Sequence, residues 1–189
     1  MLAILAEDQS DAEALKVIVR KHLKNESLSI RMKGYDGGGN LLAKGWRDIA
    51  SWRRRGYTKF LLCHDSDGRS VDDVLKTLRD EVIQRCGLSS ECFCLVVPVQ
   101  ELEAWLIADE VAVQDEIPSF RFTGHEHPEN IKSPKEWLQD ESHSKKARPL
   151  YVPKLNNPGI ASKLRHDVVA RKCPSFRRLL SDLSRCFST

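Results

Sequence analysis

Short apolar runs alternate along the first 109 residues with longer segments in which apolar positions recur every three or four residues. The runs cover residues 2–6, about 28–32, 60–63 and 92–98. Short runs without polar alternation predict strands that are buried on both faces of a parallel sheet, and the longer segments predict amphipathic helices. A strand followed by a helix, repeated four times, predicts an α/β fold with right-handed crossovers.

Helix start signals support this order. Ser10 and Glu13 have the spacing of a capping box for the first helix, the glycines at 37–39 open the second, and Ser70 precedes the third. Residues 100–109 read as one helix after the fourth strand. The glycine triplet could cradle a phosphate or serve only as a flexible turn, since it lacks the lysine of a P-loop.

Beyond residue 115 the pattern loosens into a proline-rich stretch that ends near residue 153. It contains one short helix signal at Ser133, and two further helices are predicted to start at Asn157 and Pro174. We therefore expect an α/β domain over residues 1–112 with a four-stranded parallel, Rossmann-like sheet. Residues 113–189 are expected to form an irregular insertion and a C-terminal helical extension that pack on the same core.

Acidic residues follow three of the four predicted strands. They are Glu7 after the first strand, Asp65 and Asp67 after the third, and Glu101 and Glu103 after the fourth. The carboxyl ends of parallel strands meet at one edge of the sheet, where ligands of such folds bind. Carboxylates gathered there repel one another unless a cation neutralises them, and their hard oxygen atoms select Mg²⁺ or Mn²⁺. The predicted metal ligands are Glu7, Asp65 and Asp67, together with at most one of Glu101 and Glu103, because a helix would send these two to different sides.

Simpler interpretations exist for each acidic residue. The stretch from Asp65 to Gly68 could be a turn or a cap, although it does not continue as an EF-hand loop. Glu7 and Asp11 could be anions at a helix N-terminus, which the helix dipole favours. His64 adjoins the acidic loop and could support its carboxylates.

The distribution of charge along the chain points to a possible binding partner, a nucleic acid. The chain of 189 residues carries a net charge of +3, but residues 145–189 contain eleven Lys or Arg and two acids, so that they carry +9 and residues 1–144 carry −6. A basic segment beside an acidic one suits a nucleic acid held through its phosphates, whereas a solvated helical face would also use such residues. The predicted backbone contacts are Lys145, Lys146, Arg148, Lys163 and Arg165.

Composition excludes several other classes. With 41% hydrophobic and 30% charged residues the chain is typical of globular proteins. No apolar run approaches the roughly 18 residues that span a bilayer, and the N-terminus does not resemble a signal peptide, so we expect a cytoplasmic protein without membrane contact. The six cysteines lack metal-binding spacing and are expected to be buried thiols.

The acidic pattern resembles a known family. Glu7 with Asp11 four residues later, followed by Asp65-Ser66-Asp67 after a later strand, is similar to the Toprim domain of topoisomerases, primases, OLD-family nucleases and small ribonucleases. The segments at 97–109 and 173–183 resemble small stand-alone Toprim-like bacterial proteins of poorly defined function, some of which occur in phage-defence settings. The common motif has a glycine directly after its glutamate, where this chain has Asp8.

The resemblance implies a Mg²⁺-dependent nuclease that hydrolyses phosphodiester bonds of DNA or RNA. Glu7 would act as general acid or base together with Asp11, or as a metal ligand, and Asp65 and Asp67 would hold the metal. The match at Glu103-Ala104-Trp105 implies that Glu103 is the further candidate ligand. Lys154, chosen from the basic segment, is expected either to contact the scissile phosphate or to be an exposed lysine in a proline-bounded loop. Two other classes stay open, namely a phosphatase-like phosphoryl hydrolase and a non-catalytic nucleic-acid-binding or regulatory subunit of an ATPase complex.

Overall fold

A computed structural model, which describes residues 1–143 and 148–187, contains one all-parallel sheet of four strands. The spatial order is β2-β1-β3-β4. The predicted fold class is therefore confirmed, with strand boundaries that differ by no more than two residues from the predicted ones. The strands are β1 (Leu2–Ala6), β2 (Ile30–Gly34), β3 (Lys59–Cys63) and β4 (Phe93–Val96).

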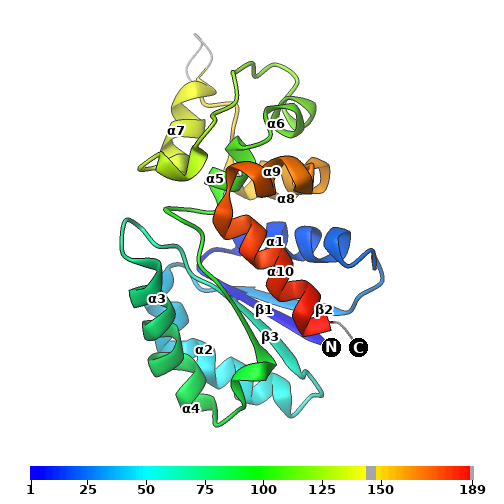
Figure 1. Cartoon of the computed structure of the whole chain (residues 1–189), viewed down its shortest axis with the longest axis vertical. Coiled ribbons are helices and arrows are strands. Elements are labelled where there is room, and N and C mark those ends of the chain that lie inside the picture. The colour runs from blue at the N-terminus through cyan, green and yellow to red at the C-terminus, as the bar shows by residue number, and fades with distance from the viewer. Residues whose placement is uncertain (144–147, 188–189) are drawn as a thin grey trace.

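Helices cover both faces of the sheet (Figure 1). Alternate residues of β1 enter two separate apolar clusters: Ile4 belongs to the cluster beneath α1 and α10, and Leu5 belongs to the cluster beneath α2 and α3. Burial on both faces explains why the strands read as unbroken apolar runs. The helices of this part are α1 (Gln9–His22), α2 (Gly38–Arg53), α3 (Val71–Leu78), the π-helical turn η1 (Arg79–Ile83), α4 (Gln84–Cys86) and the 3₁₀ turn η2 (Ser90–Cys92).

The C-terminal part is more helical than the sequence predicted. Its apolar side chains join the cluster beneath α1, and Trp105, Tyr151 and Phe176 are among the largest fully buried residues of the protein. The elements are α5 (Glu103–Ile107), α6 (Glu110–Glu116), the 3₁₀ turn η3 (Pro128–Asn130), α7 (Pro134–Glu141), α8 (Pro153–Lys163), α9 (His166–Lys172) and α10 (Pro174–Phe187).

Two predicted helix boundaries were wrong for identifiable reasons. The helix expected over residues 100–109 is confined to Glu103–Ile107. A separate helix, α6, begins at Glu110, where the carboxylate of Asp109 accepts a hydrogen bond from the Ala112 amide. The helix expected to start at Asn157 starts instead at Pro153, where the fixed φ of proline suits the first helical position. Pro158 lies inside this helix.

The start of α1 also differs from its prediction. Asp8 is the N-cap, and the capping box is closed by Asp11 rather than by Glu13. Ser10 lies within the helix and is buried. The chain thus turns from β1 into α1 through only Glu7 and Asp8, which keeps both of them close to the end of the strand.

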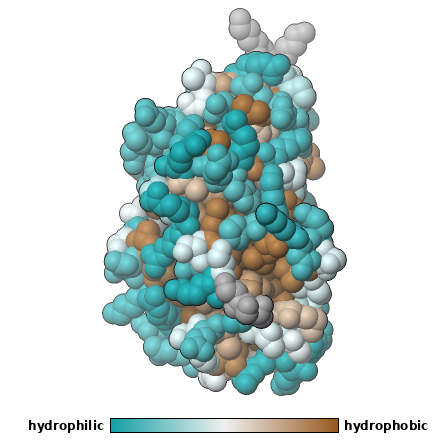
Figure 2. All heavy atoms as spheres, turned by 45° about the vertical axis from the view of Figure 1, so that its right-hand side comes forward, coloured by the Kyte–Doolittle hydropathy of each residue, from teal (hydrophilic) through white to brown (hydrophobic). Residues whose placement is uncertain are grey.

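The surface in the view of Figure 2 is mostly hydrophilic, with apolar side chains gathered near the middle of that face. Among the described residues, no helix combines the length and the apolar composition that crossing a bilayer requires.

Candidate functional site

The candidate site lies at the carboxyl ends of β1 and β3, the two central strands. The chain leaves β1 toward β2 on one side and β3 pairs with β1 on the other, so the sheet reverses its strand order between β1 and β3. Ligands of open α/β sheets bind at such a point. In this pairing Leu5 lies opposite Leu62, and the same offset continued past the strands places Glu7 opposite His64.

Glu7 and His64 form a close pair between these strand ends. The Oε1 atom of Glu7 lies 2.7 Å from Nδ1 of His64 and accepts a hydrogen bond from the Asp65 amide at 2.8 Å. Burial opposes ionisation of Glu7, but the hydrogen bond and the charge of His64 outweigh it and lower the Glu7 pKa. Burial also opposes protonation of His64, and Glu7 outweighs it and raises the His64 pKa. Glu7 is therefore held as a carboxylate.

The glycine triplet packs against this pair at the start of α2. The amide of Gly38 helps to lower the pKa of Glu7, and the amide of Gly37 donates to the Glu7 carbonyl oxygen at 3.0 Å. A Cβ atom at position 38 would lie 2.5 Å from Nε2 of His64 and 3.0 Å from Cδ of Glu7, whereas one at position 39 would meet nothing within 4 Å. In this structure the triplet thus contacts a protein carboxylate.

Gly38 and Gly39 provide a matched pair of substitutions. Gly38→Ala is expected to lower the free energy of unfolding by about 1–2 kcal/mol, because the methyl group overpacks the Glu7–His64 pair. Gly39→Ala is expected to leave it unchanged or raise it by up to about 1 kcal/mol, because alanine favours the helix. Urea unfolding measures both values, and equal effects at the two positions would contradict the packing described here.

Three further carboxylates lie buried beside this pair, namely Asp65 after β3, Asp11 in α1 and Glu103 in α5. Their exposed fractions are 9%, 4% and 1%. Burial, together with repulsion from Asp11, Glu103 and then Glu7, raises the pKa of Asp65 well above its usual value. Burial and the charge of Glu103 likewise raise the pKa of Asp11. The protein thus concentrates negative charge at one buried place.

Glu103 is held in place from the C-terminal part of the chain. Its Oε1 atom accepts hydrogen bonds from the Tyr151 hydroxyl at 3.1 Å and from Nδ2 of Asn157 at 3.2 Å. The Tyr151 hydroxyl also lies 2.5 Å from Oδ1 of Asn157. Glu103 therefore belongs to a fixed polar network between α5 and α8, and Tyr151 and Asn157 were not predicted as part of the site.

Lys135, in the first turn of α7, lies among these carboxylates. Burial lowers its pKa, but Glu103, Asp11 and Asp8 outweigh this effect and raise the pKa above that of an exposed lysine. Its Nζ atom lies 3.5 Å from Oδ2 of Asp8. The amide of Lys135 donates to Oε2 of Glu101 at 2.8 Å, so that Glu101 fixes the start of α7 outside the cluster.

Asp67 lies at the rim of the site. It is exposed and has a positive φ of 47°, and its charge contributes the smallest of the repulsions that raise the Asp65 pKa. A cavity of about 530 Å³ opens beside it, lined by Asp67, Gly68, Gln100, Glu101, Lys132, Ser133 and Glu136. Within residues 1–143 and 148–187, no three His, Cys, Asp or Glu side chains already stand close enough together to hold an ion.

The described basic residues that were predicted to contact nucleic acid differ in whether they have an ion-pair partner within the chain. Lys154 is exposed at the start of α8, and among the described residues it makes no ion pair. Lys163 pairs with Glu116 at 2.5 Å, and Arg165 pairs with the buried Asp109 at 2.6 Å, so both cations have partners within the chain. Arg148 is exposed, and the predicted contacts Lys145 and Lys146 lie outside the described residues.

The structure thus brings together Glu7, Asp11, Asp65 and Glu103 and leaves Asp67 at the rim. Sequence reasoning named His64 only as a possible support for the carboxylates and did not identify Lys135. The position of His64 directly before Asp65 was a signal for its pairing, because the strand register places it opposite Glu7. Lys135 carried no comparable signal, since its role depends on where α7 packs.

Comparison with known proteins gives a family but no activity. The family model DUF4276, described as a domain of unknown function, matches residues 6–184. No curated protein and no solved structure gives a significant match.

Proposed function

The chain belongs to the DUF4276 family, and from the chemistry of its own side chains we propose that it is a Toprim-like, divalent-metal-dependent phosphodiesterase acting on nucleic acid. The observation that carries the proposal is the group of buried carboxylates at the switch point of the sheet. Asp65 and Asp11 both have raised pKa values there, because burial and then repulsion from neighbouring carboxylates disfavour their charged forms. Raised pKa values of this kind are typical of functional sites.

The donor atoms are of the type that a hard divalent cation prefers, although among the described residues no three such side chains stand close enough together to hold one. Asp65, Glu103 and Asp11 offer carboxylate oxygens from three elements, and oxygen ligands are those that Mg²⁺ and Mn²⁺ prefer. These three residues would hold the ion, with Asp67 available at the rim. When bound, the ion would supply charge stabilisation for the phosphoryl oxygens and would lower the pKa of a water molecule.

The other side chains have separate roles in this proposal. Glu7, kept ionised by His64 and the backbone amides, would accept the proton of the attacking water. Lys135 would attract the anionic substrate to a region that is otherwise negative. The cavity beside Asp67 would admit the strand to be cleaved.

The test is a panel assay with the purified full-length protein. End-labelled single- and double-stranded DNA and RNA are incubated with Mg²⁺, Mn²⁺ or EDTA, and products are resolved by size. We expect cleavage in Mg²⁺ or Mn²⁺ and none in EDTA. Isothermal titration with Mn²⁺ alone, which needs no substrate, is expected to show one or two bound ions.

Other outcomes would overturn the proposal in recognisable ways. Turnover of p-nitrophenyl phosphate without cleavage of any nucleic acid would indicate a phosphatase. Salt-dependent binding of nucleic acid without turnover would indicate the non-catalytic regulatory subunit of an ATPase complex. Failure to bind Mn²⁺ would show that Lys135 alone balances the carboxylates.

A further inference from the structure

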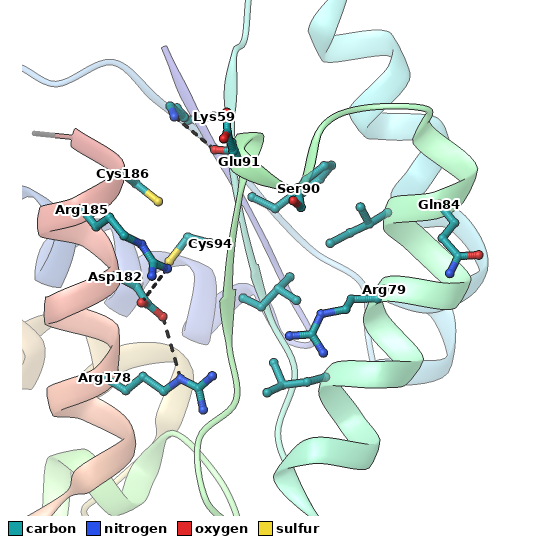
Figure 3. Close-up of a pocket in the computed structure, with 14 residues that line it drawn as sticks. Lys59, Arg79, Gln84, Ser90, Glu91, Cys94, Arg178, Asp182, Arg185 and Cys186 are labelled. Carbon is teal, nitrogen blue, oxygen red and sulfur yellow. Dashed lines mark hydrogen bonds and ion pairs between the residues drawn. The ribbon is translucent and has the colours of Figure 1, made fainter. Parts of the chain in front are cut away.

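A second cavity lies away from the acidic site, along the outer edge of the sheet. It has a volume of about 740 Å³ and extends beside β4, between α10 on one side and α3 with η1 on the other (Figure 3). Its floor is formed by Phe93, Cys94 and Leu95 of β4. None of the carboxylates of the acidic site lines this cavity. We call it the β4 groove.

The floor of the β4 groove is an open strand edge. β4 is the last strand of the sheet, paired only with β3 among the described strands. The carbonyl oxygen of Val96 accepts from the His64 amide and so faces β3. Because main-chain groups alternate in direction along a strand, the amide and the carbonyl group of Leu95 face the groove instead. Among the described residues, no hydrogen bond outside the sheet ladder involves them.

The walls of the β4 groove are cationic. The described residues that line it include four cations, Lys59, Arg79, Arg178 and Arg185, and two acids, Glu91 and Asp182. Asp182 is already shared, because it lies 2.9 Å from Arg185 and 4.0 Å from Arg178. Arg79 extends from η1 toward β4 and forms no ion pair with any described residue (Figure 3).

A second copy of the chain does not suit this groove. Two copies that paired their β4 edges would bring Arg79, Arg178 and Arg185 of one copy against the same residues of the other. Like charges held face to face in an interface oppose association. An occupant of opposite charge is therefore favoured, and the open backbone groups of Leu95 require that it can pair as a strand.

We propose that the β4 groove binds an extended, acidic peptide segment of a partner protein, which adds to the sheet as a fifth strand. Main-chain hydrogen bonds to Leu95 would provide part of the affinity, as in other cases of strand addition. Apolar side chains of the peptide would cover Phe93 and Leu95, and its carboxylates would pair with Arg79 and with the arginines of α10. An exposed edge strand is a natural template for such pairing.

The experiment uses a displayed library of random 12-residue peptides selected against the full-length protein. Enriched sequences are expected to combine Asp or Glu with Val, Ile or Thr, and to lose about tenfold in affinity for Arg79→Glu and Arg178→Glu. Arg177→Glu is the matched control, because Arg177 is exposed on α10 next to Arg178 but does not line the groove. In hydrogen exchange, the Leu95 amide is expected to be slowed by a selected peptide.

Several results would refute the proposal. These are peptides that bind both Arg79→Glu and Arg178→Glu unchanged, unaltered exchange at Leu95, and failure to enrich any acidic sequence. Dimerisation that protects Leu95 without peptide would identify a second copy as the occupant, and binding of polyphosphate or nucleic acid with the same mutational pattern would identify a polyanion. Asp65→Asn is expected to leave peptide binding unchanged, so that this test is independent of the proposed chemistry.

Discussion

Replacing Asp65 with Asn is expected to abolish phosphodiester cleavage and, at the same time, to stabilise the protein. Asn keeps the shape of the side chain but removes a buried charge that is repelled by Asp11, Glu103 and Glu7. We expect a fall in kcat/KM of about 10³-fold or more, since a ligand of the proposed cation is lost. In EDTA, the Tm at pH 8 is expected to rise by about 2–4 °C, which corresponds to roughly 1 kcal/mol for a chain of this size.

The two readouts separate function from folding. Replacing a residue that only supported the fold would lower both the Tm and the activity of the protein. Removing the charge of Asp65 is expected to raise the Tm and lower the activity. Asp140→Asn is the control, because Asp140 is exposed on α7. Retained cleavage in Asp65→Asn would refute its proposed role, and a lower Tm in EDTA would refute the charge repulsion described here.

Replacing Lys135 with Met is expected to destabilise the protein in a pH-dependent manner. The folded-state pKa values of Asp11 and Asp65 are raised, so that their contribution to stability is fully present below the unfolded value of 3.8 and is lost as pH rises through the folded values. Lys135 opposes that loss while it is charged. We therefore expect Lys135→Met to lower the free energy of unfolding by about 3 kcal/mol at pH 8 and by less at pH 5.

Urea unfolding at the two pH values, with and without Mn²⁺, measures this effect. Mn²⁺ is expected to restore part of the lost stability, because a bound cation would replace the charge of Lys135. Lys154→Met is the matched comparison, since Lys154 is exposed and makes no ion pair with a described residue. A pH-independent loss in Lys135→Met would show that Lys135 acts through packing alone.

The fold could be predicted from short-range patterns. The runs at β1 and β3 are apolar because both faces of the sheet are covered, and this signal does not depend on distant contacts. Boundaries within the C-terminal part could not be predicted in the same way. Asp109 caps the start of α6 through its carboxylate, which accepts a hydrogen bond from the Ala112 amide and pairs with Arg165 from a distant part of the chain. Tertiary contacts of this kind override the intrinsic helix propensity of the local sequence.

Part of the candidate site, like part of the fold, could be predicted from the sequence. Glu7, Asp65 and Glu103 could be grouped because topology alone brings strand ends together. Lys135 could not be found, because it reaches the carboxylates through α7, whose first turn is fixed by Glu101. Lys154 was chosen from its position in a basic segment, and nothing in such a segment indicates which lysine faces the acids.

The hydrogen bonds of Tyr151 and Asn157 to Glu103 bear on how the family can be dissected. A fragment that ends at residue 112 would retain the buried carboxylate of Glu103 without the hydroxyl and amide groups that donate hydrogen bonds to it. Chimeras that transplant only the first 112 residues would therefore lose the environment on which the acidity of the neighbouring groups depends. For the same reason, α8 and the sheet are expected to be inherited as one evolutionary unit.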